Sequence, residues 1–105
     1  MLDLTDNTFD SYINSSTKPV LVDFWAGWCG PCKALAPKLE TFSKSTNDVI
    51  VAKVDVDKNM ETAKARNVTG LPTLVLYQNG KEVARSVGIP KSGIDEFINQ
   101  NIFIK

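Results

Sequence analysis

Hydrophobic positions follow two periods along the chain, one typical of buried strands and one typical of helices. Val20–Trp25 and Val49–Val54 are β-prone and almost continuously apolar, as strands covered on both faces are. Between them, Leu35, Leu39 and Phe42 recur at the spacing of one helix face. This β–α–β pattern predicts two parallel strands joined by a right-handed crossover.

The segments outside this unit repeat the same two patterns. Asn79-Gly80 is a strong hairpin signal between two β-prone runs. The other expected elements are a strand at Leu2–Leu4, a helix around Phe9 and Ile13, a helix at about Asn59–Arg66, strands at Thr73–Tyr77 and Glu82–Val87, and a helix around Ile94 and Phe97. The order β-α-β-α-β-α-β-β-α predicts an α/β fold with a mixed central sheet and helices on both faces.

Length and charge narrow the class of protein. The 105 residues suit one domain, and without repeats or long linkers we expect residues 1–105 to be a single unit. The 12 Lys and Arg balance the 12 Asp and Glu, so no excess of positive charge points to nucleic acid or anionic lipid. No segment approaches the roughly 20 apolar residues of a membrane span, and the acidic start is unlike a secretory signal. We expect a cytoplasmic monomer.

The histidine and cysteine counts exclude several classes of catalytic and metal site, because the chain has no histidine and only two cysteines. Ser-His-Asp and Cys-His nucleophile systems and imidazole-based metal sites are impossible without histidine. Two cysteines are too few for a four-sulfur zinc or iron–sulfur site within one chain. We expect no metal site.

Both cysteines, Cys29 and Cys32, lie at the junction of a predicted buried strand and a helix, separated by Gly30-Pro31. A helix N-terminus offers unpaired N–H groups and a partial positive charge, which stabilise a thiolate. Pro31 suits a first helical turn and stiffens the loop that holds the two sulfur atoms together. Cys29, at or just before the first turn, should feel this effect more than Cys32.

Three functions are open to this cysteine pair. A purely stabilising disulfide is disfavoured, because closing a loop of four residues removes only roughly 2 kcal/mol of unfolded-state entropy. A metal site would need two more ligands, and haem attachment would need a histidine where Lys33 stands. Redox catalysis is therefore the favoured interpretation.

The stretch from Trp25 to Lys33, WAGWCGPCK, resembles the active-site motif of the thioredoxin family, and the resemblance covers nearly the whole chain. Further matching positions are Asp23, Pro37, Lys53, Leu71-Pro72, Asn79-Gly80 and Gly88. The resemblance implies a dithiol–disulfide oxidoreductase that reduces protein disulfides. Its partners would be disulfide-containing proteins and a thioredoxin reductase that supplies electrons from NADPH, or a ferredoxin-linked counterpart. No tightly bound cofactor is expected.

In such an enzyme, thiolate Cys29 attacks a substrate disulfide, and Cys32 then resolves the mixed disulfide and leaves a Cys29–Cys32 bond. Cys32 must lose a proton, and no histidine is present to take it. Asp23 is the candidate base, since it interrupts an apolar strand that should raise its pKa; a solvent-facing or turn-capping role is the alternative. Lys53 is either a solvated strand residue or the neighbour of Asp23 across the parallel pair, where it would tune Asp23. The resemblance favours the catalytic roles of both residues.

From sequence alone Leu71-Pro72 is an ordinary turn with a trans bond, because only about 5–6% of X-Pro bonds in folded proteins are cis. The resemblance implies the opposite, a cis Pro72 beside the two sulfur atoms. It also implies substrate contacts from the backbone of Leu71, from Trp28 and from the loop at Gly88. Leu71 departs from the β-branched residue expected there, which bears on substrate preference.

Two other functions compete with the reductase. An oxidase or isomerase shares its chemistry, but strongly oxidising relatives usually carry a histidine between the cysteines, where this chain has Gly30-Pro31. A non-catalytic binding subunit would use the same fold as a platform.

Overall fold

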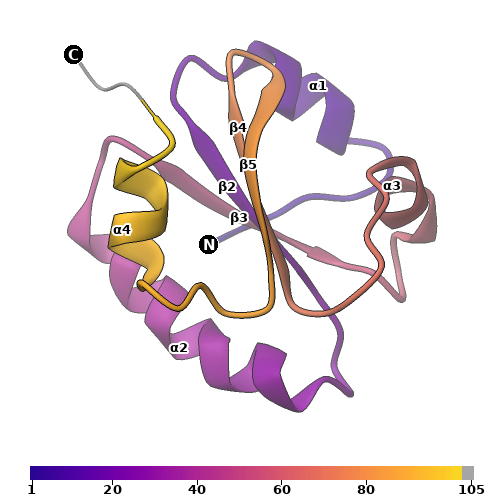
Figure 1. The fold of residues 1–105 in the computed structure, drawn as a ribbon. Coiled ribbons are helices and arrows are strands. Elements are labelled where there is room, and N and C mark those ends of the chain that lie inside the picture. Colours follow the sequence, from indigo (N-terminus) through magenta and orange to yellow (C-terminus); the bar gives the residue numbers. More distant parts are fainter. Residues whose placement is uncertain (103–105) are drawn as a thin grey trace.

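The strands form one mixed sheet in the computed structural model, which describes residues 1–102 (Figure 1). The elements are β1 (Leu2–Asp3), α1 (Phe9–Ser15), β2 (Val20–Trp25), α2 (Gly30–Ser45), β3 (Ile50–Asp55), α3 (Met60–Ala65), β4 (Thr73–Gln78), β5 (Lys81–Val87) and α4 (Ile94–Asn99). The predicted element order and α/β class are confirmed, and the ends of the elements differ from the predicted ones by no more than two residues.

The sheet order is β1-β3-β2-β4-β5, so β2 and β3 are neighbours. They pair in parallel, with Val20 opposite Ile50 and Asp23 opposite Lys53, which confirms the predicted crossover through α2. β4 pairs antiparallel with both β2 and β5. With a strand on each side of it, β2 has no free edge.

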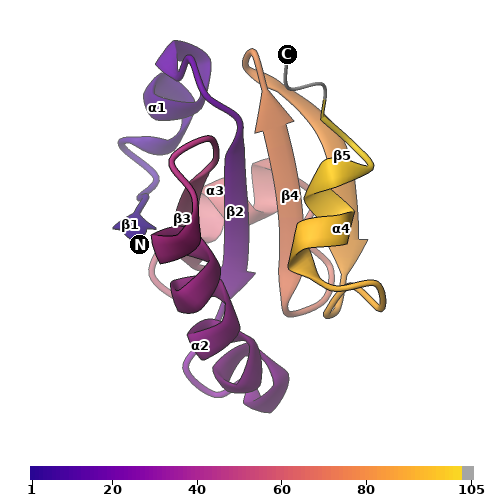
Figure 2. The ribbon, with the colours of Figure 1, turned by 90° about the vertical axis from the view of Figure 1, so that its left-hand side faces the viewer.

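Helices cover both faces of the sheet, α1 and α3 one face and α2 and α4 the other (Figures 1 and 2). This arrangement explains the nearly continuous apolar run of β2, whose side chains alternate between the two cores. Val22 and Phe24 belong to the core under α1, and Leu21 packs with Leu35 and Leu39 of α2. Within residues 1–102 no helix is both long and apolar enough to cross a membrane.

The N-terminal segment helps to hold α3 in place. The Asp6 carboxylate accepts hydrogen bonds from the Thr62 N–H (2.8 Å) and hydroxyl (2.7 Å), and these bonds hold the pKa of Asp6 below its usual value. In return the Asp6 N–H donates to Asn59 Oδ1 at 3.0 Å. The carboxylate that accepts a hydrogen bond from the first turn of α3 therefore belongs to Asp6, which lies 56 positions before Thr62.

Phe9 anchors α1 to the sheet, since its buried ring lies 6.1 Å from that of Phe24 and 5.7 Å from that of Tyr77, centroid to centroid. Phe9→Ala is expected to lower the free energy of unfolding by about 3–5 kcal/mol, because it leaves a cavity among these rings. Urea denaturation measures the change, with Val83→Ala on the exposed edge as the control expected to cost little. A loss below about 1 kcal/mol for Phe9→Ala would contradict this packing.

Candidate active site

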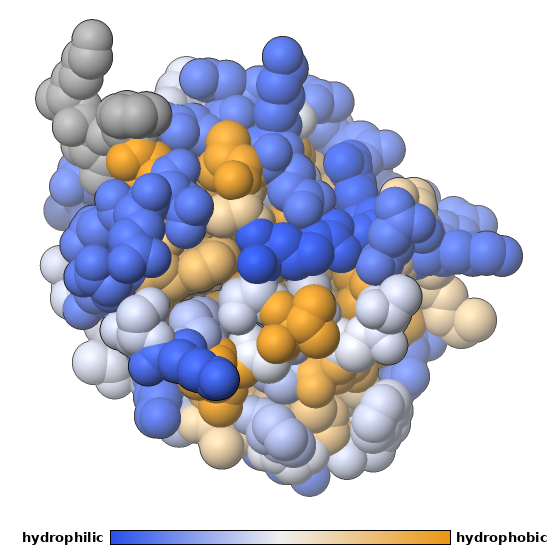
Figure 3. All heavy atoms as spheres, in the orientation of Figure 1, coloured by the Kyte–Doolittle hydropathy of each residue, from blue (hydrophilic) through white to orange (hydrophobic). Residues whose placement is uncertain are grey.

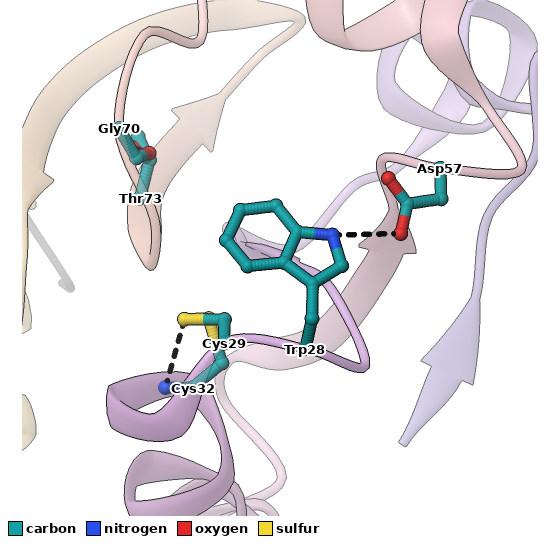
Figure 4. The surroundings of a disulfide bond; sticks show 6 residues. All are labelled: Trp28, Cys29, Cys32, Asp57, Gly70 and Thr73. Atoms are coloured by element: carbon teal, nitrogen blue, oxygen red, sulfur yellow. Dashed lines mark hydrogen bonds between the residues drawn. A yellow bond between two sulfur atoms is a disulfide. The ribbon is translucent and has the colours of Figure 1, made fainter.

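The two cysteines form a disulfide where β2 gives way to α2 (Figure 4). Cys29 is the N-cap of α2, and its Sγ accepts a hydrogen bond of 3.2 Å from the Cys32 N–H. Gly30 and Pro31 occupy the first turn between them, as predicted. Both cysteines are buried, so the α2 N-terminus acts on sulfur atoms that are largely removed from water.

A second loop, between α3 and β4, lies against the disulfide. The Leu71-Pro72 bond is cis, as the family resemblance implies. Leu71 packs on the small cluster that contains Cys29 and Cys32, and the Thr73 hydroxyl closes the loop by donating to the Gly70 carbonyl at 2.5 Å. The loop thus brings Leu71 into contact with the cluster that contains the redox pair.

Gly88 joins a third loop to this site. Its N–H donates to the Pro72 carbonyl at 2.7 Å, and its φ of +91° lies in the left-handed region that favours glycine. Close by, a Cβ on Gly70 would come within 3.2 Å of a Val87 methyl carbon. Gly70 in the α3–β4 loop and Gly88 in the β5–α4 loop therefore allow these two loops to approach each other closely.

Trp28 presents its indole ring at the surface, where it is 70% exposed beside the disulfide. Its Nε1–H donates to the Asp57 carboxylate at 3.0 Å, and Figure 4 shows the ring between the disulfide and Asp57. Asp57 was not among the site residues predicted from the sequence. Its position just after β3 could have indicated that it lies near Trp28, which follows β2, because neighbouring parallel strands end at the same edge of a sheet.

Apolar side chains surround the redox pair. Trp28, Met60 and Leu71 line a groove of about 410 Å³. Val87 at the end of β5 and Ile89 on the β5–α4 connection are also exposed. In Figure 3 apolar side chains gather on the lower half of the face that carries this connection, while polar side chains cover α4. The loop at Gly88 thus carries an exposed apolar residue, Ile89, and the exposed Met60 lines the groove together with Trp28.

Asp23 is 3% exposed and lines a small cavity of about 110 Å³ together with Cys32 and Lys53. Burial raises the pKa of Asp23 to about 7, while the nearby Lys53 charge opposes this rise. Its Oδ1 has no hydrogen-bond partner among the described residues. The structure thus brings a carboxyl group that titrates near neutral pH to the inner side of the disulfide.

Comparison with known proteins agrees with this geometry. The Thioredoxin family model matches residues 1–100. A thioredoxin of Mycobacterium bovis is 52% identical over 86 residues, which are 81% of this chain and 74% of that protein. The solved structure of Plasmodium falciparum thioredoxin superimposes with a TM-score of 0.88 at 38% identity, covering 95% of this chain and 98% of that one.

The chain belongs to the thioredoxin family. It is a thiol–disulfide oxidoreductase whose redox-active disulfide joins Cys29 and Cys32. The family includes a longer relative, the bifunctional thioredoxin reductase/thioredoxin of Mycobacterium leprae, which is 51% identical over 88 residues. Those residues are 83% of this chain but only 19% of that protein.

The raised pKa of Asp23 predicts that stability falls with pH. Between the unfolded pKa of about 3.8 and the folded pKa of about 7, the folded state binds the extra proton, so unfolding becomes easier as pH rises through this window. The loss is about 4 kcal/mol at most and is complete above pH 7. Asp23→Asn should therefore stabilise the oxidised protein more at pH 8 than at pH 4.5.

Urea denaturation of the disulfide form at both pH values measures this effect without titration of the cysteines. Asp48→Asn, which removes an exposed carboxylate, is the matched control and should keep the pH dependence of the parent. An equal gain for Asp23→Asn at both pH values would show that Asp23 keeps an ordinary pKa in the folded protein.

Proposed function

We propose that the chain is a general protein-disulfide reductase that works through a mixed disulfide between Cys29 and its substrate. The observation that carries this proposal is the difference between the surroundings of the two sulfur atoms. Cys29 caps α2 beside the exposed Trp28, whereas Cys32 lies deeper and shares a cavity with Asp23. One cysteine is suited to meet the substrate and the other to receive help from a base.

Cys29 is the attacking residue in this proposal. In the reduced protein, the α2 N-terminus and the Cys32 N–H that now donates to its sulfur atom would stabilise the Cys29 thiolate. The thiolate attacks one substrate sulfur, a new S–S bond forms, and the substrate disulfide breaks with release of one substrate thiolate.

Cys32 completes the reaction with Asp23 as its base. The Cys32 thiol gives its proton to the Asp23 carboxylate and attacks the Cys29 sulfur atom. The mixed disulfide breaks, the second substrate thiolate leaves, and the Cys29–Cys32 bond forms. A carboxyl group with a pKa of about 7 suits this step, because it is substantially ionised at neutral pH and still basic enough to hold a proton.

Substrates would dock on the apolar surface around the disulfide. Trp28 offers the largest exposed side chain, and Leu71 presents backbone groups beside the cis Pro72. Gly88 keeps the third loop close without adding a side chain. Contacts of this kind select an extended segment near a disulfide and do not depend on one particular sequence.

Electrons would come from NADPH through a thioredoxin reductase, with the Cys29–Cys32 pair as the carrier and no bound cofactor. A relative that joins a thioredoxin reductase to a thioredoxin in one protein supports this pairing. A reducing compartment such as the cytoplasm would keep the pair available as a dithiol. The monomeric state remains a prediction.

Serine substitutions separate the two cysteine roles. Cys29→Ser should abolish insulin-disulfide reduction driven by NADPH and a thioredoxin reductase, because a hydroxyl cannot attack the disulfide at neutral pH. Cys32→Ser should also block turnover but accumulate a mixed disulfide through Cys29, visible by intact-protein mass spectrometry. Unchanged activity in Cys29→Ser, or a mixed disulfide trapped on Cys32 in that variant, would refute the assigned order of attack.

The base role of Asp23 predicts a selective kinetic defect. Asp23→Asn should slow resolution of the mixed disulfide by roughly 100-fold near pH 7, at the lower end of what a positioned base contributes, and leave its formation much less affected. Stopped-flow tryptophan fluorescence with a disulfide peptide can separate the two steps. Equal resolution rates in the mutant and the parent would remove Asp23 from the mechanism.

A further inference from the structure

Three charged side chains lie in one row across neighbouring strands. Asp3 of β1 is opposite Lys53 of β3, and Lys53 is opposite Asp23 of β2. Residues paired in register point to the same face of a sheet, so the row places a negative, a positive and a negative group side by side. Lys53 and Asp23 are site residues predicted from the sequence, whereas Asp3 is not.

The row runs from solvent into the core. The side chain of Asp3 is 72% exposed and that of Lys53 31% exposed, while Asp23 is only 3% exposed. The position of the Lys53 ammonium therefore decides how much positive charge reaches the buried end.

The Lys53 ammonium is drawn to the outer side of this row. Its Nζ lies 3.7 Å from Asp3 Oδ1 and 5.4 Å from the centroid of the Trp25 ring. Among residues 1–102 the ion pair of Lys53 is with Asp3 and not with Asp23. Trp25 lines the cavity together with Asp23, whereas Asp3 does not, so the pairing with Asp3 is the contact that holds the ammonium on the side away from Asp23.

We propose that Asp3 is a positioning residue for the thiol–disulfide reaction, which holds the Lys53 ammonium on the outer side of the row and so limits the positive field at Asp23. The inference rests on the base role of Asp23 given above. Loss of the Asp3 charge would free Lys53 to turn toward Asp23 and favour its ionised form. It would also remove a weak like-charge repulsion, which acts in the same direction.

Other groups around Asp23 stay unchanged when Asp3 is replaced. β4 contributes only the apolar Leu74 opposite Asp23. Among the described residues, the other charged or titratable residues that line the cavity are Lys33 and Cys32 of α2 and Met1, whose amino group lies 3.9 Å from Glu40. In the oxidised protein Cys32 is part of the disulfide and does not titrate.

The test is a carbon-detected NMR titration of the Asp23 carboxyl group in the oxidised protein at low salt. Asp3→Asn should lower the titration midpoint by about 0.3–0.5 pH unit, the size expected from a partly exposed ion pair. Asp3→Glu, which keeps the charge, should stay close to the parent. Asp48→Asn, an exposed carboxylate outside the row, should cause no shift.

A double-mutant cycle shows whether Asp3 acts through Lys53. In a Lys53→Met background, Asp3→Asn should shift the Asp23 midpoint by less than half as much as it does in the parent. An equal shift in both backgrounds would mean that Asp3 acts directly, and no shift or an upward shift in the parent would mean that it does not restrain Lys53. Each of these results would overturn the inference.

The titration needs no turnover, so its outcome is independent of the proposed function. In the kinetic assay, Asp3→Asn should move the pH profile of mixed-disulfide resolution downward by the same amount as the NMR midpoint. A shifted NMR titration with an unshifted kinetic profile would support the placement of Lys53 by Asp3 and overturn the base role of Asp23.

Discussion

The parallel pairing of β2 with β3 is the interaction on which the site depends. Because the two strands run in the same direction, α2 must cross over one face and begin at the carboxyl end of β2, where Cys29 caps it. The same pairing sets Lys53 opposite Asp23 and brings Asp57, just after β3, to the Trp28 indole. One backbone register therefore positions the disulfide, its buried acid and its exposed aromatic residue.

The site contains a buried group, the Asp23 carboxyl, that makes the fold less stable than an apolar side chain would. A carboxyl group in the middle of the central strand is unfavourable when ionised, since Asp23 Oδ1 has no partner and Lys53 is paired elsewhere. An apolar residue there would suit the core better. The raised pKa of Asp23 results from this unfavourable burial, and it is the property that the proposed base role of Asp23 requires.

Local patterns predicted the elements well and their partners less well. The apolar runs of β2 and β3, the helical spacing of α2 and the Asn79-Gly80 hairpin are each encoded within a few residues. Asp57 and Met60 were missed because their roles depend on what lies across a loop boundary. Asp6 illustrates the same limit, since it caps a helix that begins more than 50 residues later.

The linear chain already fixes the chemistry available to this protein: two cysteines at the spacing and helix position that favour a reactive thiol, and no histidine to assist them. It also determined the α/β class, because strand and helix periodicities are local. Which side chains come into contact depends on how the chain folds. The packing of Leu71 on the disulfide cluster and the ion pair of Lys53 with Asp3 join residues far apart in the chain, and the cavity shared by Cys32 and Asp23 lies between a helix and a strand. Such contacts arise from strand register and packing, which no local pattern specifies.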